Sequence, residues 1–328
     1  MLPDLIQITS RLRMRQLRLL IALDESGTLH RAAERIAISQ PGATKALHEI
    51  ESSLGLTLFT RSSQGLQANE LGRCVIRYAR LIHNDLAHMR DELQGILQGH
   101  GGHLAVGSIA GAVPHLLRAI TELRRQQPQM SIQVVEDISP RLLKLLDDGR
   151  LELAIARTSA SQQPDAYERV SLHPEGLTLV AHRDHPQQDN TALCLADLAA
   201  YSWVMYPPGT PMRSVLEHTF SEQSVSFPRY PLETSSTFTM LSLLQADPQL
   251  VAVMPESIAQ SSEQFGLLRR LPLALQARNE PYAIIHRRNA VLSPLATQLL
   301  TQLREALAIP ASEQTTLLEV THQRQQTE

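Results

Sequence analysis

The segment 28–55 constrains the fold most strongly, because it encodes two short helices separated by only a few residues. Thr28 is placed to cap a helix over 29–36. Ser39 is placed to cap the next helix, which carries Pro41 in its first turn, where a missing N–H group costs nothing. Two helices joined by so short a turn, the second strongly capped, predict a helix-turn-helix.

The neighbouring residues complete a small domain around this motif. A helix is predicted over 14–25, before a stop at Gly27, and residues 58–67 predict two short strands with a polar tip, here called the wing. The second helix of the motif carries apolar residues at helical spacing, and we expect these to be buried: Ala43, Leu47, Ile50 and Leu54.

Composition limits the other classes of protein. The chain has 328 residues, of which 43% are hydrophobic and 19% charged, and this is typical of a globular protein of about two domains. No apolar run approaches the ~20 residues of a membrane span, and the first ten residues lack a secretion signal. We therefore expect a cytoplasmic protein with no membrane partner. Cys74 and Cys194 lack partners at metal-ligand spacing, so we expect packing roles for both, and no metal or cofactor.

A long helix is predicted to follow the wing. Residues 71–99 carry an apolar stripe at steps of three or four, near the coiled-coil period, and glycines around 99–102 then break the helix. We predict that the stripe pairs with a second copy of the chain, and packing of the stripe on its own domain is the alternative. The predicted dimer contacts are Tyr78, Ile82, Leu86, Met89 and Leu93.

The rest of the chain predicts an α/β fold. Residues 103–309 alternate strands with amphipathic helices, and the opening order of strand, helix, strand, helix, strand predicts a parallel sheet. A strand over 282–286 and a helix over 294–307 have no third lobe to join, so we expect them to return to the first sheet. The predicted division is a winged helical domain 13–70, a linker helix 71–99, a hinge 100–102, an α/β region 103–309 (lobe I about 103–170 and 279–309, lobe II about 171–278) and a mobile tail 310–328.

In order along the chain, these segments resemble a known family. They are similar to the winged helix-turn-helix, linker helix and two-lobed α/β region of LysR-type transcriptional regulators, over nearly the whole chain. The residues that carry the resemblance are Leu17 through Gly27, Ala32-Ala33, Ser39-Gln40-Pro41, Leu47, Ile50-Glu51, Leu54-Gly55, Leu58-Phe59, Arg61, Gly65-Leu66 and Gly72. Departures occur at Gly42-Ala43, where a bulkier pair is commoner, and at Asn69, where the family usually has threonine.

The resemblance implies partners as well as a fold. It implies sequence-specific binding of double-stranded promoter DNA, with a small-molecule effector held in the cleft of the α/β region, which resembles periplasmic binding proteins. It also implies a homodimer or a homotetramer built as a dimer of dimers, and contact with RNA polymerase at the promoter.

The residue types around the second motif helix suit a DNA groove. The helix N-terminus at Ser39 offers N–H groups to a phosphate, and Gln40 can pair with a base edge. Arg31 and Arg61 suit the DNA backbone or the minor groove. The predicted DNA contacts are Arg31, Ser39, Gln40, Pro41, Thr44, Lys45 and Arg61.

Plainer roles remain open for part of this set. Thr44 and Lys45 also fit a solvated helix face, and Pro41 fits a helix starter. Residues 11–70 hold eight basic and six acidic residues, which is a weak excess of positive charge. A single copy should therefore bind DNA loosely, and useful affinity requires paired copies.

Polar residues follow several predicted strands of the α/β region. In open α/β sheets ligands bind beyond the carboxyl ends of the strands, where such residues gather. The predicted effector contacts are Ser108, Ile109, Ser139 and Arg157 in lobe I, and Pro207, Gly209, Thr210, Arg213, Thr234 and Ser235 in lobe II. Each serine or threonine taken singly is more simply a helix cap. Arg157 and Arg213 favour a carboxylate or another small anion, because a guanidinium holds two oxygens at once. Residues 203–210 resemble the branch of the family that senses sugars or aromatic acids.

Two other classes of function have weaker support. His182-Arg183-Asp184 is similar to part of a kinase catalytic loop, but no glycine-rich phosphate loop accompanies it, so we do not expect an enzyme. His182 and His185 with Cys194 lack a fourth zinc ligand at suitable spacing. The remaining alternative is a solute-binding protein with an N-terminal oligomerisation module, which the missing secretion signal opposes.

Overall fold

The computed structural model describes residues 2–62, 65–98, 102–161, 163–172, 176–278, 281–288 and 290–306. Residues 100 and 101 of the predicted hinge, the end of the predicted α/β region at 307–309 and the predicted tail at 310–328 lie outside this part of the chain. The chain forms two compact units, of which the first contains residues 1–105 with 129–132 and 144–152. The five-part division expected from the sequence stays a prediction.

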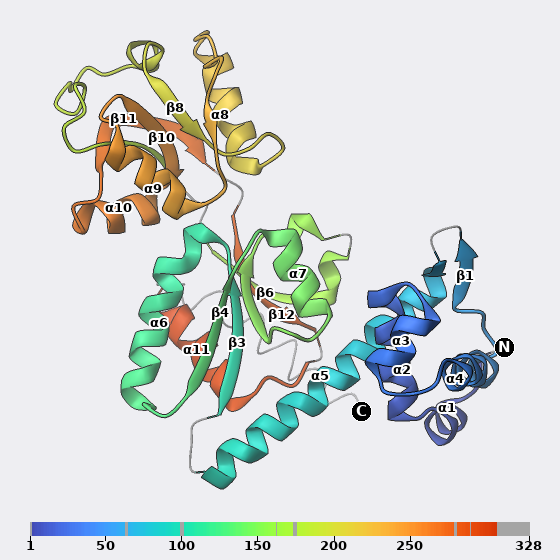
Figure 1. Ribbon diagram of the computed structural model, residues 1–328. Helices are drawn as coiled ribbons and strands as arrows, with labels where there is room; N and C mark the ends of the chain where they lie inside the picture. Colours follow the sequence, from blue (N-terminus) through green and yellow to red (C-terminus); the bar gives the residue numbers. More distant parts are fainter. Residues whose placement is uncertain are drawn as a thin grey trace. The chain divides into compact units, whose positions relative to one another are not determined.

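Short helices and a two-stranded wing open the first unit (Figure 1). The elements are α1 (Leu5–Arg11), α2 (Met14–Ser26), α3 (Leu29–Arg35), α4 (Gln40–Leu54), β1 (Phe59–Ser62) and β2 (Gly65–Ala68). The helices predicted from residue 14 onward and the wing are confirmed, whereas α1, which Asp4 caps, was not predicted. Leu19, Leu20, Leu23, Ile50 and Leu58 are fully buried between these elements.

The long helix α5 (Glu70–Gln98) begins directly after the wing. Asn69 caps it, because its side-chain Oδ1 accepts a hydrogen bond from the Gly72 N–H at 2.8 Å. Asn69 thus takes the capping role of the threonine usual at this position. A Cβ atom on Gly72 would lie 2.1 Å from the carbonyl oxygen of Leu58, so only glycine lets the helix start so close to the wing. Ile76 and Ala79 are buried on the inner face of α5.

The first α/β sheet has the strand order β4-β3-β5-β12-β6. Its strands are β3 (His103–Ser108), β4 (Ser131–Glu136), β5 (Leu153–Ala156), β6 (Tyr167–Ser171) and β12 (Ala283–Arg287), and its helices are α6 (Val113–Gln126), α7 (Ser139–Asp147) and α11 (Pro294–Ala306). β3 and β5 are parallel, and β12 is antiparallel to β5 and β6. The sheet is therefore mixed, and the predicted return of the strand near residue 284 to it is confirmed.

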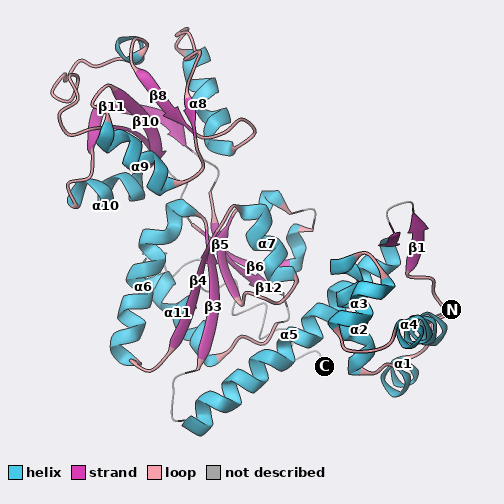
Figure 2. Cartoon of the chain, in the orientation of Figure 1, coloured by secondary structure: helices cyan, strands magenta, loops and turns pink. Residues whose placement is uncertain are grey.

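The second α/β sheet has the strand order β11-β7-β10-β8-β9. Its strands are β7 (Gly176–Ala181), β8 (Ser202–Met205), β9 (Leu232–Glu233), β10 (Leu250–Pro255) and β11 (Arg269–Arg278), and its helices are α8 (Pro211–Glu222), α9 (Thr237–Ala246) and α10 (Glu256–Gln264). β8 runs parallel to β9 and β10, and β7 runs antiparallel to β10 and β11. Figure 2 shows helices beside both sheets.

The order of the strands along the chain predicts where a ligand would bind at the end of each sheet. In the first sheet β3 lies between β4 and β5, and helices connect these strands in the chain order β3, β4, β5. In the second sheet β8 lies between β9 and β10, and helices connect these strands in the chain order β8, β9, β10. Right-handed crossovers then put successive helices on opposite faces, and a switch point forms at the carboxyl ends of β3 and β5 and of β8 and β10. The effector contacts predicted from the sequence lie at the ends of β3, β4, β5, β8 and β9 or in the segments that follow them.

Both cysteines differ from expectation. Cys74 and Cys194 are exposed rather than packed. Cys74 lies on a solvent-facing side of α5, and the Cys194 thiol donates to the Asp197 carboxylate at 3.1 Å at the start of a short 3₁₀ helix. The described residues hold no cluster of three side chains suited to a metal ion. Within the same residues, no helix is both long and apolar enough to cross a membrane.

His185 makes the stability of the second sheet depend on pH. Its side chain is fully buried against Tyr201, and its Nε2 has no hydrogen-bond partner among the residues that the structure describes. Burial lowers the pKa of His185 below its ordinary value of about 6.5. An unfolded chain therefore takes up a proton that the native chain resists, and the free energy of unfolding falls as the pH drops below about 6.5.

We expect urea unfolding to require less denaturant at pH 5.5 than at pH 7.5. Trp203, the single tryptophan of the chain, is buried in this sheet, and its fluorescence reports on the transition. The variant His185→Gln, which has no proton to take up, should lose less stability between the two pH values. An equal loss in both proteins would contradict this assignment.

Candidate nucleic-acid interface and effector site

Ser39 caps the N-terminus of α4. Ser39 Oγ accepts a hydrogen bond from the Gly42 N–H at 3.2 Å, and the Ala43 N–H donates to the Ser39 carbonyl at 2.9 Å. A Cβ atom on Gly42 would lie 3.1 Å from Ser39 Oγ, which is a tight contact, so glycine at this position leaves space for the capping hydroxyl. Pro41 has no N–H group, so the Gln40 N–H is the first-turn donor that pairs with neither oxygen of Ser39. This N–H and the partial positive charge of the helix end suit a phosphate.

The side chains of α4 divide cleanly between core and solvent. The four apolar residues predicted to be buried are buried, with Ala43 and Ile50 wholly inaccessible. The seven residues predicted to contact DNA are all exposed: Arg31, Ser39, Gln40, Pro41, Thr44, Lys45 and Arg61. Lys45 lies 4.0 Å from Glu49 and its side chain is 80% exposed, so this ion pair leaves the ammonium free to reach a ligand.

The wing is fixed to the helices by backbone contacts. Glu51 of α4 accepts hydrogen bonds from the N–H groups of Leu58 at 2.7 Å and Phe59 at 3.4 Å. The Leu66 N–H donates to the carbonyl of Gly27 at 2.9 Å, and a Cβ on Gly65 would lie 2.5 Å from that same oxygen. Arg61, on β1, is thereby held in a defined position relative to α4.

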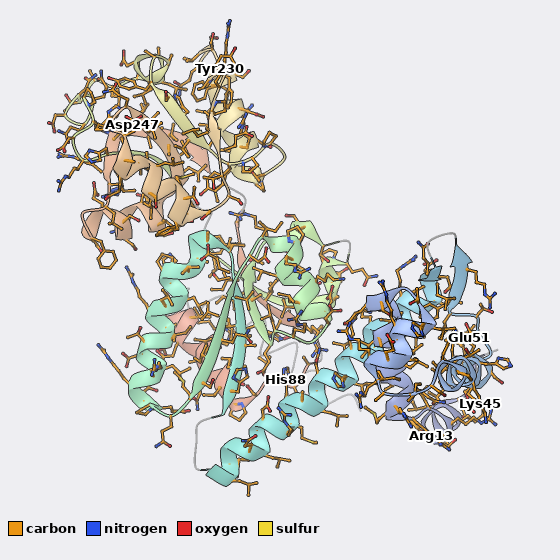
Figure 3. The ribbon with its side chains drawn as sticks, viewed as in Figure 1. Arg13, Lys45, Glu51, His88, Tyr230 and Asp247 are labelled. Atoms are coloured by element: carbon orange, nitrogen blue, oxygen red, sulfur yellow. The ribbon has the colours of Figure 1, made fainter. Side chains whose placement is uncertain are left out.

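Two arginines near α4 were not predicted as contacts. Arg13 and Arg15 line a cavity of about 380 Å³ together with Ser39 and Gly42. Figure 3 labels Arg13 and Lys45, which extend from the helical part of the first unit. The alternation of arginines at positions 11, 13 and 15 was the available signal, but only the fold brings the start of α2 beside the start of α4.

The apolar stripe of α5 is open to solvent in the single chain. The exposed fractions are 55% for Tyr78, 40% for Ile82, 42% for Leu86, 51% for Met89 and 51% for Leu93. These are the five side chains predicted to pair with a second copy. Ala79, one heptad before Leu86, is buried, so part of the same helix face is covered nearer the start of α5. Val75, at the start of the stripe, packs against the core of the helical domain. Pairing with a second copy and packing on its own domain therefore both stay predictions.

In lobe I, the structure brings all four predicted effector residues to the ends of β3 and β5, where the Ile109 N–H donates to the Ile155 carbonyl at 3.0 Å. Ser139, the first residue of α7, accepts a hydrogen bond through Oγ from the Arg157 N–H at 3.0 Å. Ser108 is buried and donates to the Ile109 carbonyl at 2.9 Å, so its hydroxyl is already bonded. The Arg157 guanidinium is buried and stacks 5.9 Å from the centre of the Tyr282 ring.

In lobe II, Arg213 is already neutralised by carboxylates. Its Nε donates to Glu217 at 2.7 Å and its Nη1 to Glu233 at 3.0 Å. The guanidinium also lies 4.7 Å from the centre of the Phe227 ring. An anion at Arg213 would have to displace these partners, so the geometry assigns Arg213 to packing of α8 against β9. Thr210 caps α8, and Gly209 before it has a φ of 80° that favours glycine.

The start of α9 differs in detail from the prediction. Ser236, not Ser235, is its cap and accepts from the Thr239 N–H at 3.2 Å, while Thr234 accepts from the Ser236 N–H at 3.1 Å. Ser235 is exposed. The hydroxyl of Thr237 is buried and without a hydrogen-bond partner among the described residues. Burying such a hydroxyl is costly unless a ligand or water pairs with it, so Thr237 joins the candidate effector contacts.

Two family models match the chain. The model "Bacterial regulatory helix-turn-helix protein, lysR family" matches residues 14–73. The model "LysR substrate binding domain" matches residues 97–308. Together they cover the winged helices and both α/β sheets.

Similar proteins agree with these matches. The chain is 34% identical over 301 residues to the HTH-type transcriptional regulator GbpR of Azospirillum brasilense, covering 91% of this chain and 88% of that protein. It is 27% identical over 300 residues to the HTH-type transcriptional regulator GalR of Pseudomonas putida, covering 89% and 74% of the two chains.

Solved structures share the fold. Full-length CbnR complexed with its target DNA superposes with a TM-score of 0.61 at 21% identity, covering 90% of this chain and 100% of that one. A full-length OxyR variant from Pseudomonas aeruginosa superposes with a TM-score of 0.58 at 22% identity, covering 91% and 95%.

Loss of the Ser39 cap should loosen the start of α4. We expect Ser39→Ala to cost about 1 kcal/mol of local stability, which corresponds to roughly fivefold faster amide hydrogen exchange in peptides over α4. Ser52→Ala, an exposed position near the other end of the same helix, serves as the matched control. Equal exchange in both variants would argue against the capping role.

Proposed function

Because the chain belongs to the LysR family of bacterial transcriptional regulators, we propose that α4 is the helix that reads promoter DNA in the major groove. The supporting observation is the division of α4 into a buried apolar face and an exposed polar face beside a capped N-terminus. Ser39, the Gln40 N–H group and the partial positive charge of the helix end hold a phosphate, which fixes the position of the helix on the duplex.

In this proposal the exposed residues of α4 after Ser39 recognise the bases. Gln40 pairs with a base edge, Thr44 contacts a base or a phosphate, and Lys45 reaches a guanine or the backbone. Arg61 of the wing contacts the adjacent minor groove, and Arg31 contacts the backbone. Pro41 starts the helix at the surface of the DNA.

Two copies act together in this proposal. The exposed stripe of α5 buries itself against the same stripe of a second chain, because five large apolar side chains at coiled-coil spacing are costly in water. The dimer then presents two α4 helices to half-sites about one helical turn apart. A tetramer built from two dimers is the larger assembly that we propose.

An effector binds at the carboxyl ends of the strands in this proposal. Arg157 and Ser139 in lobe I, and Gly209, Thr210 and Thr237 in lobe II, supply the polar contacts. The flanking residues that shape the site are Ser108, Ile109, Pro207, Thr234 and Ser235. Arg157, at the carboxyl end of β5, is the cation that we propose for a small anion such as an organic acid. Effector binding changes how the lobes and chains pack, and thereby the bending of DNA and the contact with RNA polymerase.

The chain acts by binding and not by catalysis in this proposal. Its relatives are named as regulators of transcription, and the polar groups described above are hydrogen-bond and charge contacts without a nucleophile and base pair. Promoter DNA is its target, so we propose that it works in the cytoplasm.

Removal of the Gln40 amide should relax sequence preference. We expect Gln40→Ala to lose about 1 to 3 kcal/mol of discrimination at one base position, while the chain remains folded. Selection of binding sites from a random duplex library, followed by sequencing, measures this preference. Ser52→Ala is the control on the same helix, and a Gln40→Ala selection identical to that of the natural chain would refute the contact.

Charge in the α5 stripe should weaken the dimer. The double variant Leu86→Asp and Leu93→Asp would bury two carboxylates at the proposed interface, so we expect monomers by light scattering at concentrations where the natural chain is paired. Gln94→Asp introduces the same charge at an exposed position off the stripe and should leave the mass unchanged. An intact dimer in the double variant would remove α5 from the interface.

A further inference from the structure

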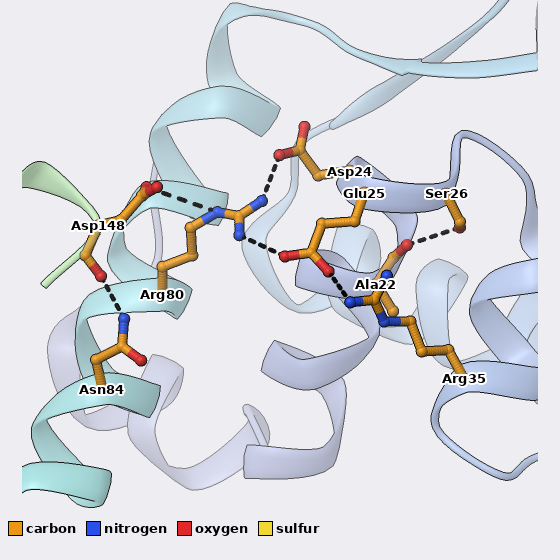
Figure 4. A network of polar contacts seen from close by, with 8 residues as sticks. All are labelled: Ala22, Asp24, Glu25, Ser26, Arg35, Arg80, Asn84 and Asp148. Carbon is orange, nitrogen blue, oxygen red and sulfur yellow. Dashed lines mark hydrogen bonds and ion pairs between the residues drawn. The ribbon is translucent and has the colours of Figure 1, made fainter. Parts of the chain in front are cut away.

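A cluster of charged residues surrounds Arg80 on the inner side of α5 (Figure 4). Arg80 Nη2 lies 2.7 Å from Asp24, and Nη1 lies 2.9 Å from Glu25, at the end of α2. Its Nε lies 3.7 Å from Asp148, which directly follows α7. Arg35 of α3 also pairs with Glu25, at 2.6 Å. These residues, here called the Arg80 cluster, all belong to the first compact unit.

One guanidinium therefore joins three parts of the chain. The planar group has five N–H donors, so it can contact the carboxylates of α2 on one edge and Asp148 in the turn after α7 on another. The Arg80 side chain is 17% exposed and that of Asp148 is 16% exposed, so solvent screens this contact less than an open surface pair. Burial alone would lower the pKa of Arg80, but the hydrogen bonds to Glu25 and Asp24 and the charge of Asp148 more than offset it and raise the pKa, so the charge is kept.

The turn after α7 also docks on α5 through its backbone. The Asn84 side-chain amide donates to the carbonyl of Asp148. Gly149 has a φ of 70°, and a Cβ atom there would lie 3.2 Å from Leu81 Cδ2 and 3.4 Å from Asn84 Cβ. The turn thus approaches α5 so closely that a glycine is favoured at position 149. A cavity of about 450 Å³ adjoins the cluster, and Arg80, Asn84 and Asp148 are among the residues that line it.

The opposite end of α7 is the proposed effector site. α7 begins at Ser139, whose hydroxyl accepts from the Arg157 N–H at the carboxyl end of β5. α7 is one continuous helix of nine residues, about 13 Å long, and Asp148 directly follows its last residue.

We propose that Arg80 is a positioning residue that transmits the state of α7 to the DNA-binding helices, by holding α2 and the Asp148 turn on the same guanidinium. The inference rests on the proposed function for its DNA end and its effector end. When the turn stays docked, α2 and α5 are fixed to each other and α4 is presented in one orientation. When the turn moves away, Arg80 loses one of its three carboxylate partners and the packing of α2 on α5 loosens.

Hydrogen exchange of the full chain tests the mechanical part without any ligand. Asp148→Asn keeps the shape of the side chain and removes the charge, and we expect about fivefold faster exchange in peptides that cover 22–27 of α2 and 76–84 of α5. Arg80→Lys, which keeps the charge but cannot join three carboxylates, should show the same change. Asp91→Asn is the matched control, because Asp91 on α5 pairs locally, with Arg90 at 2.6 Å. Exchange in Asp148→Asn equal to that in the control overturns the proposal.

DNA affinity tests the functional part. The duplex is one selected for binding to the natural chain. Asp148→Asn and Arg80→Lys should each bind it about fivefold more weakly than the natural chain does, because loosened helices must be ordered on the DNA. The double variant should bind no more weakly than either single variant, since both break the same connection. Unchanged affinity, or fully additive losses, overturns the transmission even where exchange has changed. If the natural chain selects no sequence at all, the proposed function fails, and the exchange experiment alone decides whether Arg80 joins α7 to α2.

Discussion

The orientation of α4 depends on close packing of three helices that meet through alanines. Ala32, Ala33 and Ala43 are at most 2% exposed, and their small side chains let α3 and α4 pack closely on α2 around the leucines of the core. A larger residue at any of these positions would push the helices apart, because a filled core has no space to take it up. The capped N-terminus of α4 and the wing that α4 carries both depend on this contact.

Local signals predicted the parts of the fold that rest on neighbouring residues. The caps Thr28 and Ser39 and the stop at Gly27 set the ends of α2, α3 and α4, because a cap is a contact between residues three positions apart. The spacing of apolar residues in α4 likewise identified which side of that helix is buried and which is open. The exposed positions of the candidate DNA contacts followed from this spacing.

Contacts between distant residues could not be read in the same way. Arg213 meets Glu217 one helical turn away, but its second carboxylate, Glu233, is brought to it by the order of β8 and β9. β11 was missed because Pro272 argues against a strand, and an edge position in the sheet, as β11 has, removes that objection. The pairing of Arg80 with Asp148 spans α5 and the turn after α7, and no local pattern relates them.

The two hydrogen bonds from the wing to Glu51 have a consequence for the promoters that such a protein can use. Since Glu51 belongs to α4, the helix and the wing form one rigid reader with a fixed separation between its two points of contact. One extra base pair between those points would shift the second contact by about 3.4 Å along the duplex and rotate it around the axis. In the proposed complex, operators can therefore vary in the identity of individual bases far more readily than in the distance from the groove read by α4 to the groove beside it.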